Sequence, residues 1–379
     1  MIKVVIVTHS LKRGGGQDRV NYEIAQEVLR RGYRLIMIAS KVAPELYQHP
    51  LAEWIHVSVQ GWPTALLRNL VFAWHSAHWL YRHRREFDVS VVNGFITWEY
   101  SDINVVHFVH NAWLKSPVYH RVFKNNLYGL YQKSYTFLNA SLEKISFNKS
   151  RVIVAVSRQV CKELLNIGIA RERIRLIYNG IDLKEFFSAN ADREKLGLPE
   201  DVTLALFVGE IRTPRKNLDT VLHALVEVPN LQLAVVGDTK RSPYPKLAVQ
   251  LGLENRVHFL GYRKDVADIM RAVDLFVFPS RYEACTLVLL EAMASGLAVV
   301  TAKTTGGSEI ITPQCGIVLD DPNDIEGLVK ALQTLVVNPD LRKQMGQAAR
   351  AIVEQHSWTN KAKEYVDLFE ETYRNKVNK

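Results

Sequence analysis

The chain has few cysteines, no long apolar run and no apolar leader. Its three cysteines, Cys161, Cys285 and Cys315, are odd in number and far apart, so they indicate neither a disulfide framework nor a zinc site. No stretch approaches 18 uninterrupted apolar residues, and the N-terminus enters a strand-like run without a charged, then apolar leader or a cleavage site. We therefore expect no membrane-spanning helix and a reduced, cytoplasmic setting.

Several recognition motifs are also missing from the sequence. There is no Asp-x-Asp pair, so no bound divalent metal is expected. The sequence has no zinc finger, no RNP aromatic motif and no basic helical arm, so nucleic acid is not an expected partner.

Positive charge and aromatic residues are concentrated in the first half of the chain. Residues 1–180 hold 24 Lys and Arg against 12 Asp and Glu, whereas the remainder holds 24 against 27. The same residues hold 23 of the 36 aromatic side chains. Such a surface suits an anionic membrane or an acidic substrate, or is an ordinary solvated face.

Short apolar runs alternate with helical patterns along the whole chain, which predicts parallel sheets covered by helices on both faces. The expected strands form two series: 3–8, 34–39, 89–92, 104–109 and 151–156, then 203–208, 231–236, 256–259, 275–278 and 298–301. A segment rich in charge, Gly and Pro, 167–201, separates the series. The 379 residues therefore predict two doubly wound domains, with ligands at the carboxyl ends of the strands.

Three consecutive glycines, Gly14 to Gly16, follow the first expected strand. A dinucleotide fingerprint would need a third small residue where Arg19 stands and an acid at the end of the second strand, which ends in Ser40-Lys41. A nicotinamide cofactor is therefore not expected here. The glycines form either a flexible loop or a turn whose backbone approaches another ligand.

The stretch PSRYEACTLVLLEAMASG, which begins at Pro279, carries two acids around a predicted helix start. Glu283 precedes a helix that begins near Thr286, and Glu291 lies within that helix. Free amides around 285–288 would bind a phosphate, while Glu291 could hold ribose or sugar hydroxyls. A phosphate joined to polyols describes a nucleotide sugar.

This Glu-x7-Glu arrangement resembles the signature of GT-B retaining glycosyltransferases of family 4, glycosyl transferases group 1. Five further segments resemble motifs of that family in the same order: Gly15 to Val20, Asn179 to Asp182 with Phe186, Val208 to Asn217, Gly306 to Glu309, and His356 to Trp358. The likeness spans essentially the whole chain. Two positions depart from it, because Glu210 replaces the usual arginine and Ala298 a common proline.

The resemblance implies an α/β GT-B fold with two Rossmann-like doubly wound domains that face a central cleft. The expected division is 1–172 for the acceptor-side domain, 173–356 for the donor domain and 357–379 for a helix that crosses back. The implied activity is retaining, metal-independent hexosyl transfer from a nucleotide sugar, by default UDP-glucose, to a glycan or lipid-linked acceptor. The nucleotide sugar is a substrate, so no cofactor is expected. A sugar-nucleotide 2-epimerase and a non-catalytic nucleotide-sugar-binding protein are the alternatives.

The resemblance also implies roles for single residues. Catalytic roles fall to His110, Glu283 and Lys216. Asp18 and Arg19 are expected to order the glycine loop. Arg212 or Arg215 could supply the cation missing at Glu210. The implied donor-binding residues are Gly15, Gly16, Arg212, Arg215, Lys216, Ala284, Cys285, Thr286, Leu287 and Glu291.

Two aromatic, basic segments of the first half have open roles. The segment 62–85 places Trp74 and Tyr81 on one side of a predicted helix that ends in arginines, so it either docks on an anionic bilayer or packs on the sheet. The tract 113–135, with Phe123 and Tyr131, could line the acceptor site. His107 lies within the expected strand 104–109 and His110 stands at its carboxyl end, and alternation places the two side chains on opposite faces, so His107 is expected to pack within the sheet.

Overall fold

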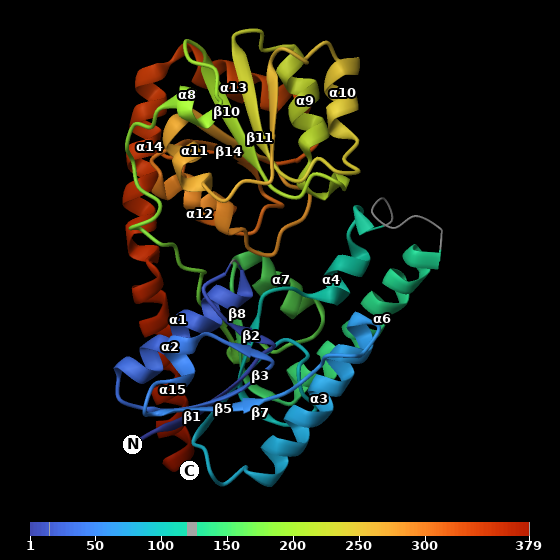
Figure 1. Ribbon diagram of the computed structural model, residues 1–379, viewed down its shortest axis with the longest axis vertical. Coiled ribbons are helices and arrows are strands. Elements are labelled where there is room, and N and C mark those ends of the chain that lie inside the picture. The colour runs from blue at the N-terminus through green and yellow to red at the C-terminus, as the bar shows by residue number, and fades with distance from the viewer. Residues whose placement is uncertain (15, 120–126, 379) are drawn as a thin grey trace. The chain divides into compact units, whose positions relative to one another are not determined.

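The computed structural model describes residues 1–14, 16–119 and 127–378. The chain divides into two compact units (Figure 1). The described part of the first unit is Met1–Ser116, residues 127–180 and the returning segment from Trp358; the second unit is built on Ile181–Ser357, with residues 117–119. Gly15 and Phe123, which the sequence singled out, lie outside the described residues.

The first unit has a parallel sheet of short, apolar strands. Its order is β5-β3-β1-β6-β7-β8-β9, and β1 pairs in register with β3 and β6 on its two sides. The strands are β1 (Lys3–Val7), β3 (Arg34–Ala39), β5 (Ala52–His56), β6 (Val89–Asn93), β7 (Ser101–Val106), β8 (Ser150–Ala155) and β9 (Ile174–Leu176). A separate parallel pair joins β2 (Ser10–Leu11) to β4 (Lys41–Val42). The strand order reverses between β1 and β6, which is the switch point where such sheets bind ligands.

Helices cover this sheet, and the last of them comes from the C-terminus. They are α1 (Gln17–Arg30), α2 (Pro44–Tyr47), α3 (Ala65–Arg82), α4 (His110–Lys115), α6 (Leu127–Asn148), α7 (Arg158–Asn166) and α15 (Trp358–Val377). Glu370 of α15 accepts hydrogen bonds from Arg31 at 2.6 Å and from the Tyr33 hydroxyl at 2.7 Å. A short 3-10 turn, η1 (Arg171–Arg173), precedes β9.

The point where the chain leaves the first unit lies against the point where it returns. Ile181 pairs in parallel with Ser357, and a Cβ on Gly180 would stand 2.5 Å from Cε3 of Trp358. Glycine at position 180 is therefore what allows the indole to pack on the departing strand. This contact gives a physical reason for both the Asn-Gly and the Ser-Trp motifs.

The second unit repeats the design with a parallel sheet in the order β12-β11-β10-β13-β14-β15. Its strands are β10 (Thr203–Val208), β11 (Leu231–Val236), β12 (Val257–Gly261), β13 (Leu275–Phe278), β14 (Ala298–Ala302) and β15 (Gly316–Leu319). Its helices are α8 (Arg193–Leu196), α9 (Leu218–Val226), α10 (Tyr244–Gln250), α11 (Val266–Ala272), α12 (Leu287–Ala294), α13 (Ile325–Val337) and α14 (Pro339–Val353), with 3-10 turns η2 (Pro214–Lys216), η3 (Ser308–Ile310) and η4 (Glu354–His356). The switch point of this sheet lies between β10 and β13.

The expected strands agree well with the structure where an apolar run is buried on both faces. The ranges 34–39, 203–208, 231–236 and 275–278 are reproduced without change. The expected strand 104–109 is wrong at its end, because β7 stops at Val106. Beyond it the amide of His110 donates to the Glu143 carboxylate at 2.8 Å and α4 begins.

Within the described residues, none of the helices is long and apolar enough to cross a membrane.

Candidate functional site

Two loops at the switch point of the second unit carry most of the predicted site. One follows β10 and contains Arg215 and Lys216; the other follows β13 and contains Glu283. Arg215 Nη1 donates to Glu283 Oε1 at 2.9 Å, and Lys216 Nζ donates to the same oxygen. The structure therefore brings two cations onto one buried carboxylate, whose residue is 8% exposed.

Lys216 is held in a confined position. Its Nζ lies 5.2 Å from the centre of the Phe278 ring, a distance at which cation–π attraction operates. Burial lowers the pKa of its ammonium, and the neighbouring Glu283 carboxylate opposes that effect. An anion entering here would find the positive charge already in place and largely desolvated, which strengthens the attraction.

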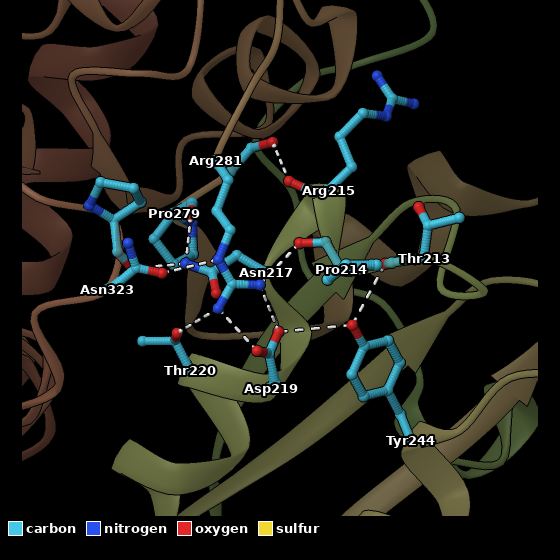
Figure 2. A network of polar contacts seen from close by, with 12 residues as sticks. Thr213, Pro214, Arg215, Asn217, Asp219, Thr220, Tyr244, Pro279, Arg281 and Asn323 are labelled. Carbon is cyan, nitrogen blue, oxygen red and sulfur yellow. Dashed lines mark hydrogen bonds and ion pairs between the residues drawn. The ribbon is translucent and has the colours of Figure 1, made fainter. Parts of the chain in front are cut away.

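The segment that carries these cations is fastened to the β13 loop by a network around Arg281, shown in Figure 2. Arg281 donates to the Pro214 carbonyl at 2.7 Å and to both carboxylate oxygens of Asp219, at 2.8 and 2.7 Å. Its amide donates to the Arg215 carbonyl at 3.0 Å. The Tyr244 hydroxyl adds a bond to the Thr213 carbonyl at 3.2 Å. Sequence reasoning gave no role to Arg281, although it lies in the stretch that begins at Pro279, and none to Asp219, because the two residues are 62 positions apart in the chain.

A third loop, which follows β14, holds the backbone of Glu283 by hydrogen bonds. The Gly306 amide donates to the Glu283 carbonyl at 2.9 Å, and the Glu283 amide donates to the Thr304 carbonyl at 3.2 Å. A Cβ on Gly306 would overlap the Ala284 carbonyl. Glu309 accepts a bond from the Gly307 amide at 2.9 Å and so orders the loop. The Gly-Gly-x-Glu motif is explained by this close approach.

The expected anion site at the start of α12 is smaller than predicted. The Thr286 amide donates to the Gly306 carbonyl at 3.2 Å, so it is not available to a ligand. Ala284 and Thr286 are buried, whereas Cys285 and Leu287 are half-buried. The amides of Leu287 and Val288 open the helix and have no intrahelical acceptor. An anion at the start of α12 would find these two amides as its backbone donors.

Glu291 lies one turn further along α12. Burial raises the pKa of its carboxyl from 4.5 to about 7, and the nearby Glu185 carboxylate adds to the effect. Near neutral pH this carboxyl is therefore poised between its protonated form, which donates a hydrogen bond, and its ionised form, which only accepts.

Glu210, which stands where the family has arginine, is used within its own loop. Its carboxylate accepts bonds from the Arg212 amide at 2.5 Å and from the Thr213 hydroxyl at 2.7 Å. Arg212 also turns back toward Glu210, 3.4 Å away, and its side chain is half exposed. Of the two expected substitutes for the missing cation, the structure places Arg215 beside Lys216 and keeps Arg212 at Glu210.

The switch point of the first unit contains a polar cavity of about 160 Å³. Its polar lining consists of His9, Gln17, Asn69, Asn93, His107, His110, Tyr135, Asn139 and Glu143. Glu143 is 3% exposed and binds both the amide of His110, at 2.8 Å, and its ring Nδ1, at 2.5 Å. The carboxylate accepts from Nδ1, which leaves Nε2 of His110 to face a ligand. Glu143 was not anticipated from the sequence, because it lies on α6, far along the chain.

Two buried atoms of this cavity lack partners within the described residues. They are Oδ1 of Asn93 and Nε2 of His107. Burial lowers the pKa of His107 to about 4, so its ring is neutral at ordinary pH. Unpaired buried polar atoms are costly, and a hydroxyl-bearing ligand or water would satisfy them.

The described part of the glycine loop leads directly into α1. Gly16 caps that helix with a φ of 62°, a conformation that favours glycine. Asp18 lies in the first turn of α1, and Arg19 pairs with Glu23 at 2.6 Å. The guanidinium of Arg19 also lies 5.9 Å from the Trp358 ring centre.

Among the described residues, no group of three or more His, Cys, Asp or Glu is arranged to hold a metal ion.

Comparison with known proteins agrees with this geometry. The sequence profile described as Glycosyltransferase Family 4 matches residues 14–185, and the profile described as Glycosyl transferases group 1 matches residues 188–352. The lipopolysaccharide glucosyltransferase WaaG of Escherichia coli K12 is 28% identical over 284 residues, 72% of this chain and 75% of WaaG. A D-inositol 3-phosphate glycosyltransferase of Xylanimonas cellulosilytica is 30% identical over 237 residues, 58% of this chain and 57% of that protein.

Solved structures share the whole fold. Sucrose-phosphate synthase from Thermosynechococcus elongatus aligns with a TM-score of 0.77 at 20% identity, covering 99% of this chain and 100% of that one. WaaG aligns with a TM-score of 0.75 at 24% identity, covering 97% and 99%. Anabaena HepE, solved with UDP-glucose, aligns with a TM-score of 0.70 at 20% identity, covering 98% and 100%. With two Rossmann-like parallel sheets and both family profiles matched in order, the chain belongs to the GT-B glycosyltransferases of family 4, the glycosyl transferases group 1.

Proposed function

We propose that this glycosyltransferase moves a hexosyl group from a nucleotide sugar to a hydroxyl of a glycan or lipid-linked acceptor. Transfer retains the anomeric configuration and needs no divalent metal ion. The observation that carries the proposal is the convergence of Arg215 and Lys216 on Glu283 at the switch point of the second unit. UDP-glucose is the default donor, in keeping with WaaG, named a lipopolysaccharide glucosyltransferase, and with HepE, solved with UDP-glucose.

Arg215 and Lys216 act on the leaving diphosphate. Two cations next to one carboxylate leave a net positive charge for the negative charge that develops as the glycosidic bond breaks. The amides of Leu287 and Val288 at the start of α12 add partial positive charge. These groups supply the stabilisation that a metal ion gives in other sugar-nucleotide enzymes.

Glu283 orients the transferred sugar through its hydroxyls. In the proposed step, the bond between the anomeric carbon and the phosphate oxygen breaks while a bond to the acceptor oxygen forms on the same face. The acceptor proton passes to the departing phosphate oxygen, so the products are the glycoside and a nucleoside diphosphate. Glu291 holds ribose hydroxyls in the same unit.

The polar cavity of the first unit binds hydroxyl groups through His110, Asn93 and Asn139. Its volume, about 160 Å³, equals roughly the liquid volume of five waters. A ligand that displaces those waters has to replace their hydrogen bonds, and a sugar does so better than an alkyl chain. His110 presents Nε2 to this ligand because Glu143 takes Nδ1.

We also propose that the first unit docks on an anionic membrane surface, on the cytoplasmic side, to reach a lipid-linked acceptor. Helix α3 supports this proposal, because it buries Phe72 and Leu80 and leaves Trp74 (59%) and Tyr81 (62%) exposed. Helix α6, joined to α3 by the Asn69–Tyr135 bond at 3.1 Å, exposes further apolar side chains. Exposed Phe137 (68%) is one of them. Aromatic rings beside arginines suit the interface of an acidic bilayer.

The first test is a thermal-shift panel of UDP-, GDP- and ADP-sugars with the wild type and Glu291→Ala. A donor at a hundredfold excess over its dissociation constant stabilises the folded state by about 2.7 kcal/mol. We expect one donor to raise the melting temperature of the wild type and to have less effect on the variant. If no donor produces a shift, the donor-site assignment is wrong.

The panel is followed by incubation with the selected donor, with and without acceptor glycosides. Release of nucleoside diphosphate that depends on the acceptor supports transfer, and activity in EDTA supports metal independence. Release without acceptor would instead indicate the 2-epimerase alternative. Binding without any release under all conditions would indicate a non-catalytic binding protein.

A further inference from the structure

We propose that Arg281, oriented by Asp219, is a positioning residue that sets the place of Arg215 and Lys216 in the donor site. The inference rests on the proposed function. It gives a role to Arg281, which lies in the stretch that begins at Pro279, and to Asp219, and the sequence analysis assigned no role to either residue. Arg281 acts by holding the loop that carries Arg215 and Lys216, and not by contact with the donor. Figure 2 shows this network from close by.

Every N–H of the Arg281 guanidinium has an acceptor within the protein. Nε donates to Asn323 at 2.7 Å; Nη1 donates to Pro214 at 2.7 Å and to Asp219 at 2.8 Å. Nη2 donates to the other oxygen of Asp219 at 2.7 Å and to Thr220 at 3.3 Å. A guanidinium has five N–H donors, so none remains for a phosphate. Its side chain is 7% exposed, which also removes it from direct contact with ligand.

The contacts of Arg281 are to the backbone that carries the two cations. Its guanidinium binds the carbonyl of Pro214, and its amide binds the carbonyl of Arg215. Ser280, its chain neighbour, donates to the same Arg215 carbonyl at 3.1 Å. The turn η2 is thus fixed to the loop that leads to Glu283. The separation of the cations from the carboxylate therefore depends on Arg281.

Arginine is required at this position by geometry as well as by charge. The bidentate pair with Asp219 uses the planar fork of the guanidinium, and the remaining donors reach three other acceptors. Lysine would keep the charge but could not satisfy these acceptors together. We therefore expect Arg281→Lys to loosen η2 while the second unit stays folded.

The test is isothermal titration of UDP and of inorganic pyrophosphate into the full-length wild type, Arg281→Lys and Asp219→Asn. We expect both dissociation constants to rise about tenfold or more in each variant, the size of one lost charge-assisted contact. Pyrophosphate carries no base or sugar, so weaker binding of pyrophosphate locates the defect at the two cations.

The matched control is Arg193→Lys. Arg193 also belongs to the second unit, pairs with Asp274 at 2.9 Å and binds the Ala272 carbonyl at 2.7 Å, but it has no contact with η2. This variant should lose thermal stability without weaker binding of UDP. If Arg281→Lys and Arg193→Lys both lose stability and both bind UDP as the wild type does, Arg281 is merely structural and the inference is overturned.

A double-mutant cycle tests whether Arg281 affects binding through Lys216. If Arg281 acts through Lys216, Arg281→Lys should weaken pyrophosphate binding much less in a Lys216→Met background than in the wild type. Fully additive losses would contradict the inference. If the wild type binds neither UDP, GDP, ADP nor pyrophosphate, the proposed function itself fails, and this result is distinct from wild-type binding that Arg281→Lys leaves unchanged.

Discussion

Replacing Glu291 with Gln should change how the stability of the protein depends on pH. The wild-type carboxyl has a pKa raised from 4.5 to about 7 by burial, with a contribution from Glu185. A group whose pKa is raised on folding binds its proton more tightly in the native state. The stability it contributes is therefore present at low pH and is lost as pH rises through the folded pKa.

The size of the effect follows from the two pKa values. Moving the pKa from 4.5 to about 7 corresponds to at most about 3.4 kcal/mol in the free energy of unfolding. A unit of this size melts about 2–4 °C lower for each kcal/mol lost. Relative to Glu291→Gln, which stays neutral, the wild type should therefore lose at most about 7–14 °C between about pH 4.5 and about pH 7, and little more above pH 7.

The assay is thermal unfolding of both proteins at a series of pH values without ligand. Near-UV circular dichroism monitors the unfolding. The difference in melting temperature should change between about pH 4.5 and about pH 7 and should level off above pH 7. The carbon-13 shift of the Glu291 carboxyl in the folded protein should titrate with a midpoint close to pH 7. Parallel stability curves, with a carboxyl that titrates near 4.5, would refute the assignment of Glu291 as a readily protonated group.

Three further predictions concern other parts of the molecule. Lys216→Met should weaken UDP binding by about tenfold to a hundredfold, because a charge-assisted contact is lost, as measured by titration calorimetry. Gly306→Ala should destabilise the protein by about 1–3 kcal/mol in denaturant unfolding, since the added methyl overlaps the Ala284 carbonyl. The double replacement Trp74→Ser and Tyr81→Ser should reduce cosedimentation with phosphatidylglycerol vesicles without altering UDP affinity.

Each of these predictions has a control within the chain. Arg212→Met alters a half-exposed cation held at Glu210 and should affect UDP binding less than Lys216→Met. Gly14→Ala adds a methyl 3.8 Å from the nearest atom and should cost little stability. Tyr262→Ser removes an aromatic ring that is 77% exposed on the second unit and should leave vesicle binding unchanged. If a control variant has a larger effect than the variant it is compared with, the corresponding prediction is contradicted.

The sequence predicted the parts of the fold that are encoded locally. Apart from Gln232 the run 231–236 is apolar, because both faces of β11 are largely covered, so its bounds were read correctly. Strand β5 was missed, because its side chains are only partly buried and its sequence, Ala52–His56, mixes polar and apolar residues. The end of β7 was misplaced, because a tertiary bond to Glu143 and not a local pattern draws His110 out of the sheet.

The sequence predicted those residues of the candidate site that belong to recognisable motifs, but not the partners that hold them in place. Glu283, Lys216 and Glu291 belong to quoted stretches, so the sequence brought them to attention. The contacts of Arg281 with Asp219 and of His110 with Glu143 join residues 62 and 33 positions apart, and nothing local signals either pair. The anion site at the start of α12 loses the Thr286 amide, because that amide donates to the carbonyl of Gly306. Gly306 also comes from a separate loop, so the sequence did not signal this contact.

The central claim is sugar transfer by the Glu283 site with retention, and the most direct test is the anomeric configuration of the product. A donor carrying carbon-13 at the anomeric position, chosen from the thermal-shift panel, would be incubated with an acceptor glycoside and followed by NMR. We predict a new glycosidic signal with the configuration of the donor, present with the wild type and lost with a folded Glu283→Ala variant. A product of the opposite configuration, or turnover that survives Glu283→Ala, would contradict the account.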